Sequence, residues 1–247
     1  ASQFVFVAEA TRSVWASMTQ GRDHVIHNVL DRQRLAKMES GARPRDEVRR
    51  QLGVEQKEKL ILCLGTICNR KGQADLIQAF ARIPKIFSNQ VHIVLKGSMA
   101  TAYEPEIKRA VAELEADEKV RIHILTEDTA VVEIYQAADI FVCASYVESY
   151  PRVILEAMHF SLPIITTDVY GIKEQIKSGV NALSFQPGDI CKLERHLSLL
   201  VGDDDLCVEL GNAARYASDS GPTFCDLVKG YAEIMKIGQI DNRLYTR

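Results

Sequence analysis

One stretch, residues 138–167 (ADIFVCASYVESYPRVILEAMHFSLPIITT), constrains what this chain can fold into more than any other. Its first apolar run, IFVC, is typical of a parallel strand that is covered on both faces. A polar break follows, and Pro151 then suits the first turn of a helix, where its missing N–H costs little. The helix is expected to end before Pro163, and the run IITT indicates a second buried strand. The stretch therefore predicts a strand, a helix and a second parallel strand.

The same alternation continues along most of the 247 residues. Apolar runs predict further strands at residues 4–7, 24–28, 60–65, 91–97, 120–125 and 182–185. Helices are predicted at residues 11–18, with Thr11 as the N-cap, around 76–80, and at 104–115, 131–137, 192–200, 205–217 and 224–236. This regular alternation predicts an α/β fold with a doubly wound, Rossmann-like parallel sheet.

Two acidic side chains interrupt the apolar pattern of the first stretch. Glu148 follows the strand, and Glu156 lies inside the helix, where Val153 and Phe160 are its neighbours at helical spacing. Desolvating a carboxylate costs free energy unless partners satisfy it. Position alone favours neither a buried structural acid nor a ligand-binding acid at Glu156. Open α/β sheets bind ligands over the strand ends, where helix N-termini attract phosphate.

A second group of polar residues follows the strand at 60–65. Gly65 ends that strand, and Arg70 and Lys71 come just before Gly72 and the next helix. A strand end, a glycine, cations and a helix N-terminus together favour a cradle for phosphate. Arg70 taken alone fits a solvated loop charge equally well.

These motifs resemble those of retaining glycosyltransferases of family 4, the glycosyl transferases group 1, which have the GT-B fold. The segment from Glu148 to Ile164 is similar to the family pattern E-x-F-G-x-x-x-x-E-A-x-x-x-G-x-P-V, although Leu162 replaces its glycine and residues 149–151 (SYP) replace x-F-G. The segment 65–72 is similar to G-R-x-x-x-x-K-G, with Thr66 in place of the arginine. The resemblance covers the chain from about Val25 onward.

The resemblance implies the C-terminal, donor-binding half of a GT-B fold. Residues 1–22 would then be the remnant of an N-terminal acceptor domain with its linker, and residues 23–247 the nucleotide-sugar domain. By the same resemblance Glu148 meets the transferred sugar, Glu156 meets the ribose, and the backbone near Leu125 and Thr126 meets the base. The implied catalytic residues are Lys71 and Glu148, and the implied donor-binding residues are Gly65, Thr66, Arg70, Lys71, Gly97, Leu125, Thr126, Ser149, Tyr150, Pro151 and Glu156.

The function that the resemblance implies is transfer of a sugar from a nucleoside-diphosphate sugar, as a hexosyltransferase that is incomplete in this chain. The acceptor, a saccharide, a lipid or a small molecule, would be held mainly by the N-terminal domain. No cofactor is expected, and the acidic run at residues 203–205 indicates a helix start, so no catalytic metal is expected either. Two alternatives stay open. One is a nucleotide-sugar epimerase of the same fold. The other is a degenerate binding or interaction domain, and its best support is Thr66, which replaces the arginine of the family pattern.

Composition also limits which classes of partner and which compartment are expected. A net charge of -3 gives no global basic field for nucleic acid. Six cysteines without a C-x-x-C pair suit a reducing compartment and indicate no zinc site. We therefore expect a cytoplasmic protein, and the cytoplasmic face of a membrane stays open for the full-length protein. The last helix is expected to leave an apolar face partly exposed, or paired in a homodimer, through Phe224, Leu227, Val228, Tyr231 and Ile234.

Overall fold

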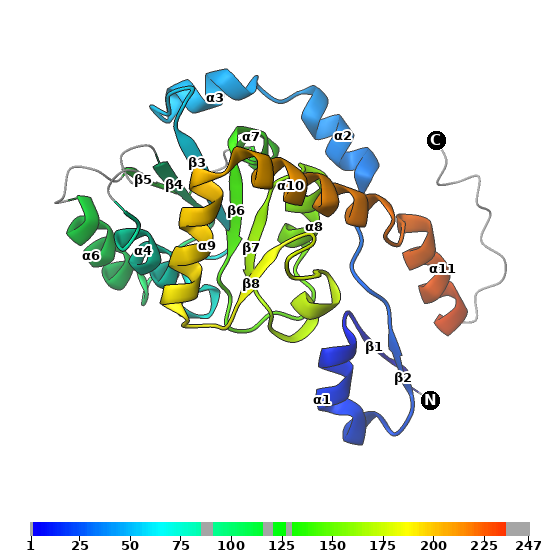
Figure 1. Ribbon diagram of the computed structural model, residues 1–247. Helices are drawn as coiled ribbons and strands as arrows, with labels where there is room; N and C mark the ends of the chain where they lie inside the picture. The colour runs from blue at the N-terminus through cyan, green and yellow to red at the C-terminus, as the bar shows by residue number, and fades with distance from the viewer. Residues whose placement is uncertain (1, 85–90, 116–120, 127–129, 236–247) are drawn as a thin grey trace.

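A computed structural model of the protein describes residues 2–84, 91–115, 121–126 and 130–235. Its main sheet has six parallel strands: β3 (Lys59–Leu64), β4 (Val91–Lys96), β5 (Arg121–Leu125), β6 (Ile140–Cys143), β7 (Ile164–Thr167) and β8 (Leu183–Phe185). Their order is β5-β4-β3-β6-β7-β8 (Figure 1). The chain reverses the direction in which it adds strands between β3 and β6, as in a doubly wound sheet. The predicted Rossmann-like α/β fold is thus confirmed.

Helices cover both faces of this sheet. One layer contains α4 (Gln73–Ala81), α6 (Glu104–Glu115) and α9 (Ile190–Gly202), and the other contains α3 (Arg45–Gln51), α7 (Val131–Ala137) and α8 (Arg152–His159), while α10 (Asp204–Asp219) touches both. Successive residues of a strand point to opposite faces, so Ile61 packs in the first layer and Leu62 in the second. Both faces are buried, and the strands are therefore continuous apolar runs.

A small unit at the N-terminus stands apart from the main sheet in Figure 1. It consists of β1 (Phe4–Phe6), α1 (Glu9–Thr19) and β2 (Asp23–Val25), and its two strands pair in parallel. The prediction of Thr11 as an N-cap is wrong, because α1 begins two residues earlier with Ala8 at the N-cap. The carboxylate of Glu174 accepts hydrogen bonds from the N–H groups of Glu9 (3.0 Å) and Ala10 (2.9 Å) and so takes over the capping role.

Two further segments differ from the sequence prediction or complete it. A short 3₁₀ helix, η2 (Tyr170–Glu174), lies outside every predicted helix and ends at Glu174. The last helix, α11 (Phe224–Met235), approaches the crossing segment at residue 26, since a Cβ on Gly230 would lie 3.2 Å from Ile26 Cδ1. The five apolar residues expected to be partly exposed on α11 are all exposed or half-buried, which confirms that prediction. Among the described residues, no helix is both long and apolar enough to cross a membrane.

Candidate functional site

The loops after β3 and β6 meet at the carboxyl ends of these two strands, where the strand order reverses. Gly72 is in the left-handed region (φ +66°), and a Cβ there would lie 2.1 Å from the carbonyl oxygen of Ala144. The N–H of Tyr146 donates to the carbonyl of Arg70 (2.8 Å). The two loops are therefore joined backbone to backbone, and only a glycine fits at the contact. A doubly wound sheet binds its ligand at this point.

The carboxylate of Glu148 is the centre of a cluster of donors at this junction. Its Oε1 atom pairs with Lys71 Nζ, and lies 3.2 Å from Arg70 Nη1 and 3.3 Å from Ser145 Oγ. The Lys71 and Glu148 side chains are only 14% and 11% exposed. The short 3₁₀ helix η1 (Asn69–Lys71) presents both cations from one turn. Because a half-buried carboxylate needs donors, this cluster fixes Glu148 in place.

Two glycines make room for Lys71. Gly65 has φ +139°, and a Cβ on it would lie 3.4 Å from Lys71 Cε, so the lysine stem lies over a residue without a side chain. Gly97 has φ +148°, and a Cβ on it would lie 2.2 Å from the Gly65 carbonyl oxygen. The ends of β3 and β4 therefore touch directly behind the lysine.

Glu156 has a partner that the sequence did not indicate. The hydroxyl of Tyr135 on α7 donates to Glu156 Oε2 (3.0 Å) and to the carbonyl of Val153 (3.2 Å). Tyr135 is buried, and that burial, followed by the nearby Glu156, raises its pKa well above the ordinary value for a tyrosine. The phenol therefore stays protonated and donates. The Glu156 side chain is 16% exposed, which leaves it accessible to a ligand.

Two cavities adjoin these groups and share part of their lining. The loop cavity, of ≈ 580 Å³, contains Lys71, Glu148 and the loop residues 149–151. The helix cavity, of ≈ 630 Å³, lies between α2 (Arg32–Ser40), α7, α8 and α11, and contains Tyr135 and Glu156. Asn28, Arg152 and Val153 line both cavities. An elongated ligand can thus occupy both at once.

The structure does not bring every predicted site residue to these cavities. Arg70, Lys71, Glu148, Ser149, Tyr150 and Pro151 line the loop cavity, and Glu156 lines the helix cavity. Gly65 and Gly97 lie behind Lys71, as described above. Thr66 is exposed, and its carbonyl accepts from Gln73 Nε2 (3.1 Å). Leu125 ends the edge strand β5 and Thr126 follows it, and neither residue lines either cavity.

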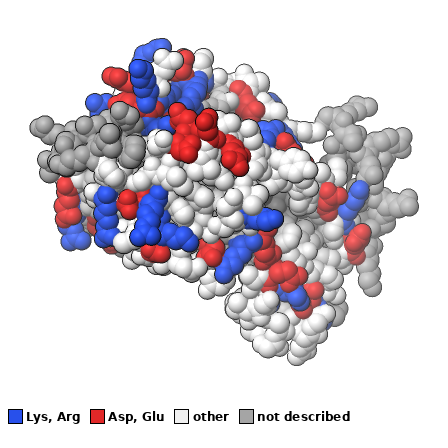
Figure 2. Space-filling model, in the orientation of Figure 1, with Lys and Arg blue, Asp and Glu red and all other residues white. Residues whose placement is uncertain are grey.

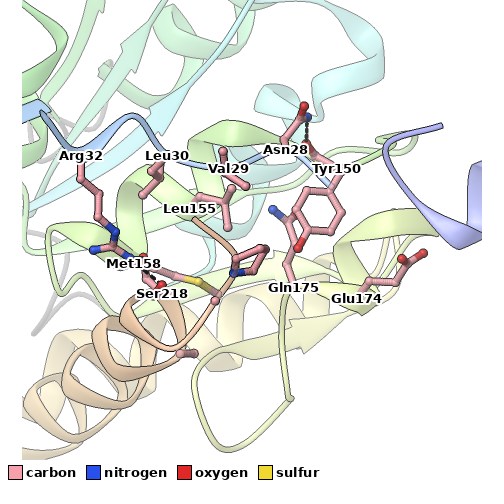
Figure 3. A pocket seen from close by; sticks show the side chains of 13 residues that line it. Asn28, Val29, Leu30, Arg32, Tyr150, Leu155, Met158, Glu174, Gln175 and Ser218 are labelled. Carbon is pink, nitrogen blue, oxygen red and sulfur yellow. Dashed lines mark hydrogen bonds between the residues drawn. The ribbon is translucent and has the colours of Figure 1, made fainter. Parts of the chain in front are cut away.

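The segment that crosses from the small unit to the main domain fixes the loop of the site. Asn28 Nδ2 donates to the Tyr150 carbonyl (2.8 Å), as Figure 3 shows, and the ring of His27 stacks on that of Tyr150 (centroids 4.6 Å apart). Gln175 Nε2 donates to the Pro151 carbonyl (3.0 Å). Sequence reasoning placed Asn28 only at the end of the predicted strand at residues 24–28, because its partner lies 122 residues away.

Away from these cavities the surface carries charges of both signs. Acidic and basic side chains alternate over the face seen in Figure 2. The described part of the chain contains no group of three or more His, Cys, Asp or Glu side chains that could hold a metal ion.

The model of the family "Glycosyl transferases group 1" matches residues 44–217. The chain therefore belongs to this glycosyltransferase family. A D-inositol 3-phosphate glycosyltransferase of Corynebacterium jeikeium is 30% identical over 176 residues, which cover 70% of this chain and 42% of that protein. An alpha-maltose-1-phosphate synthase of Mycobacterium tuberculosis is 28% identical over 230 residues, covering 87% of this chain and 58% of that protein. The chain thus spans about half the length of these relatives.

Solved structures show the same fold. Anabaena HepE, in a crystal structure with UDP and glucose, matches with a TM-score of 0.81 at 20% identity, over 96% of this chain and 63% of that chain. The C-terminal domain of the group 1 glycosyltransferase LpcC from Francisella tularensis matches with a TM-score of 0.63 at 22% identity, over 72% of this chain and 93% of that domain. The described domain thus has the fold of the C-terminal half of a GT-B protein.

Proposed function

We propose that this chain is the donor-binding domain of a retaining glycosyltransferase that uses a nucleoside-diphosphate sugar. The nucleoside occupies the helix cavity with its ribose at Glu156. The sugar occupies the loop cavity beside Glu148, and Lys71 and Arg70 face the phosphate end. The names of the relatives, a glycosyltransferase and a sugar-phosphate synthase, agree with this class of reaction.

One observation carries the proposal: two acidic side chains line two adjoining cavities, one in each, and the cavities share part of their lining. Glu148 lies among cations in one cavity, and Glu156 lies with a buried phenol in the other. A nucleotide sugar has hydroxyls at both ends, which carboxylates bind, and phosphates between them, which cations bind. Breaking the sugar–phosphate bond builds negative charge on the leaving phosphate, and fixed cations there stabilise the transition state.

We also propose the division of the chain. Residues 1–22 belong with an N-terminal acceptor domain and its linker, and residues 23–247 form the donor-binding domain. The parallel pairing of β1 with β2, which begins at Asp23, supports a crossing between the two parts close to this strand. The acceptor would then approach Glu148 from the side of α1.

Calorimetry of this chain with uridine, guanosine and adenosine diphosphates and with their glucose conjugates tests the proposal. One base series is expected to bind, and a ligand at about 100 times its dissociation constant stabilises the fold by about 2.7 kcal/mol. If no diphosphate binds, the chain is a degenerate domain. Conversion of a bound nucleotide sugar into its epimer, detected by chromatography, would favour an epimerase instead.

A further inference from the structure

Arg152 stands where the two cavities meet. It is the first residue of α8, and its side chain lines both the loop cavity and the helix cavity. The side chain is 67% exposed, and its Nη2 atom lies 3.8 Å from Glu156 Oε1, which is a loose ion pair. Its guanidinium can therefore be redirected toward a ligand at little cost.

The other cations of the site are already engaged. Lys71 Nζ pairs with Glu148, and Arg70 Nη1 donates to the Val147 carbonyl (2.8 Å) and to Glu148 (3.2 Å). Both cations thus lie at the Glu148 end of the loop cavity. Thr66, at the strand end where the family pattern has an arginine, is neutral and lines neither cavity.

We propose that Arg152 is a further cation that binds the diphosphate of the donor beside Lys71, in place of a strand-end arginine at position 66. This inference rests on the proposed function. A donor with its nucleoside beside Glu156 and its sugar beside Glu148 has its diphosphate at the shared wall, and Arg152 is the cation on that wall. A guanidinium binds phosphate oxygens in pairs, and the positive end of the α8 dipole adds to the attraction.

The binding step also frees Glu156. In the structure the Arg152 guanidinium lies beside Glu156 Oε1, and the Tyr135 hydroxyl donates to Oε2. When Arg152 turns to the diphosphate, Oε1 is left without its cation and accepts a ribose hydroxyl instead. Arg152 is thus a binding residue that couples phosphate recognition to ribose recognition across one turn of α8.

The test compares Arg152→Leu and Arg152→Lys with the wild-type chain by calorimetry, using the nucleoside diphosphate that the wild type binds and the matching nucleoside. Arg152→Leu is expected to weaken diphosphate binding about tenfold or more, which is about 1.4 kcal/mol, and nucleoside binding less than about twofold. Arg152→Lys keeps the charge but loses the paired donors, so its affinity should fall between the two. Arg109→Leu, an exposed change of the same charge on α6, is the control and should bind like the wild type.

Equal diphosphate affinity in Arg152→Leu and wild type would overturn the inference while leaving the proposed function intact. Equal losses for the diphosphate and the nucleoside would overturn it too, because Arg152 would then only shape the cavity wall. A wild-type chain that binds no nucleoside diphosphate would contradict the proposed function itself, and the inference with it. Unchanged melting temperatures of the Arg152 and Arg109 variants would show that a loss of affinity does not come from a loss of the folded structure.

Discussion

Three donors, from Lys71, Arg70 and Ser145, meet a single oxygen of Glu148, its Oε1 atom. Substitution of one donor therefore acts twice, on the stability of the ligand-free protein and on ligand binding. Removing a partner from a half-buried charge costs about 1–3 kcal/mol, more than the pair contributes net. The side chains that would bind the ligand are thus the same ones that stabilise the folded protein around Glu148.

Lys71→Ala is expected to weaken binding of the nucleoside diphosphate about tenfold or more. Binding of the bare nucleoside should change very little, because the nucleoside is proposed to occupy the helix cavity beside Glu156. Calorimetry with both ligands measures the difference. Lys71→Met keeps the stem that lies over Gly65 and serves as the control for packing. Equal losses for both ligands would contradict a phosphate role for Lys71.

Glu156→Gln is expected to weaken nucleotide binding by about 1.5–3 kcal/mol, since a charge-assisted hydrogen bond to the ribose is lost. The fold should persist, because Tyr135 can donate to the amide oxygen as it does to Oε2. The sharper measurement is the ratio of affinities for a nucleoside and its 2′,3′-dideoxy form. The wild type should discriminate and the variant should not. Lost stability with unchanged nucleotide affinity would instead make Glu156 a structural acid.

The sequence indicated Glu156 but not its partners, and the reason is physical. A carboxylate at helical spacing among apolar residues is visible within one turn of sequence. Tyr135 reaches Glu156 from another helix, 21 residues away. Tyr135 also resembles an ordinary core aromatic in composition, and its buried ring stacks on Phe160. Sequence reasoning did not single out Arg152, because only the cavities show what it faces.

At the scale of elements, the contact between the β3 and β6 loops depends on Gly72. A methyl group there would meet the Ala144 carbonyl at 2.1 Å in a left-handed conformation. Gly72→Ala is expected to destabilise the chain by about 2–4 kcal/mol, from backbone strain and overpacking combined. Gly179→Ala is the matched control, since its φ is +76° but nothing lies within 4 Å, so only the strain of about 1 kcal/mol remains. Urea unfolding of both variants measures the difference, and equal losses would contradict the clash.

A second element-scale prediction concerns β4 and β5. His92 Nδ1 lies 3.0 Å from His123 Nε2, and burial lowers the pKa of both rings. Glu58 partly opposes this at His92. A histidine whose folded pKa lies below the unfolded value of about 6.5 binds more protons when unfolded. Stability is therefore complete above pH ~6.5 and falls as the pH drops through the lowered folded values.

The measurement is the free energy of unfolding from urea titrations between pH 7.5 and pH 5.5, a window set by these histidines. His123→Asn should flatten the slope relative to wild type. A slope that persists in His123→Asn would place the titration elsewhere.

At the scale of the molecule, the alternation of strand and helix was enough to predict the doubly wound sheet. Each apolar run indicates a strand that is buried on both faces. It was not enough to place the N-terminal unit. Glu174 binds the N-terminus of α1 across 165 residues, and no local pattern encodes that contact. The predicted strand at 24–28 stops at Val25, because His27 and Asn28 turn to Tyr150.

The small unit also bears on catalysis. A two-stranded parallel sheet buries too little to be stable alone. Phe4, Val14, Trp15 and Met18 of this unit are exposed. We propose that an N-terminal acceptor domain of the same polypeptide covers them, in keeping with relatives about twice as long as the match. That domain would close the open side of the loop cavity over Glu148.

The last prediction follows from that geometry. This chain alone is expected to bind the donor but not to transfer its sugar at ordinary enzymatic rates. Without the facing domain the acceptor is not held against the anomeric carbon, and positioning contributes up to about 7–11 kcal/mol of rate acceleration. An assay of the chain with its nucleotide sugar and mixed acceptors, by release of the diphosphate and chromatography of the products, measures transfer and hydrolysis separately. Donor binding with slow hydrolysis and no transfer fits the proposal. Transfer at rates of about 1 per second or more would show that the donor-binding domain and the small unit already form a complete active site.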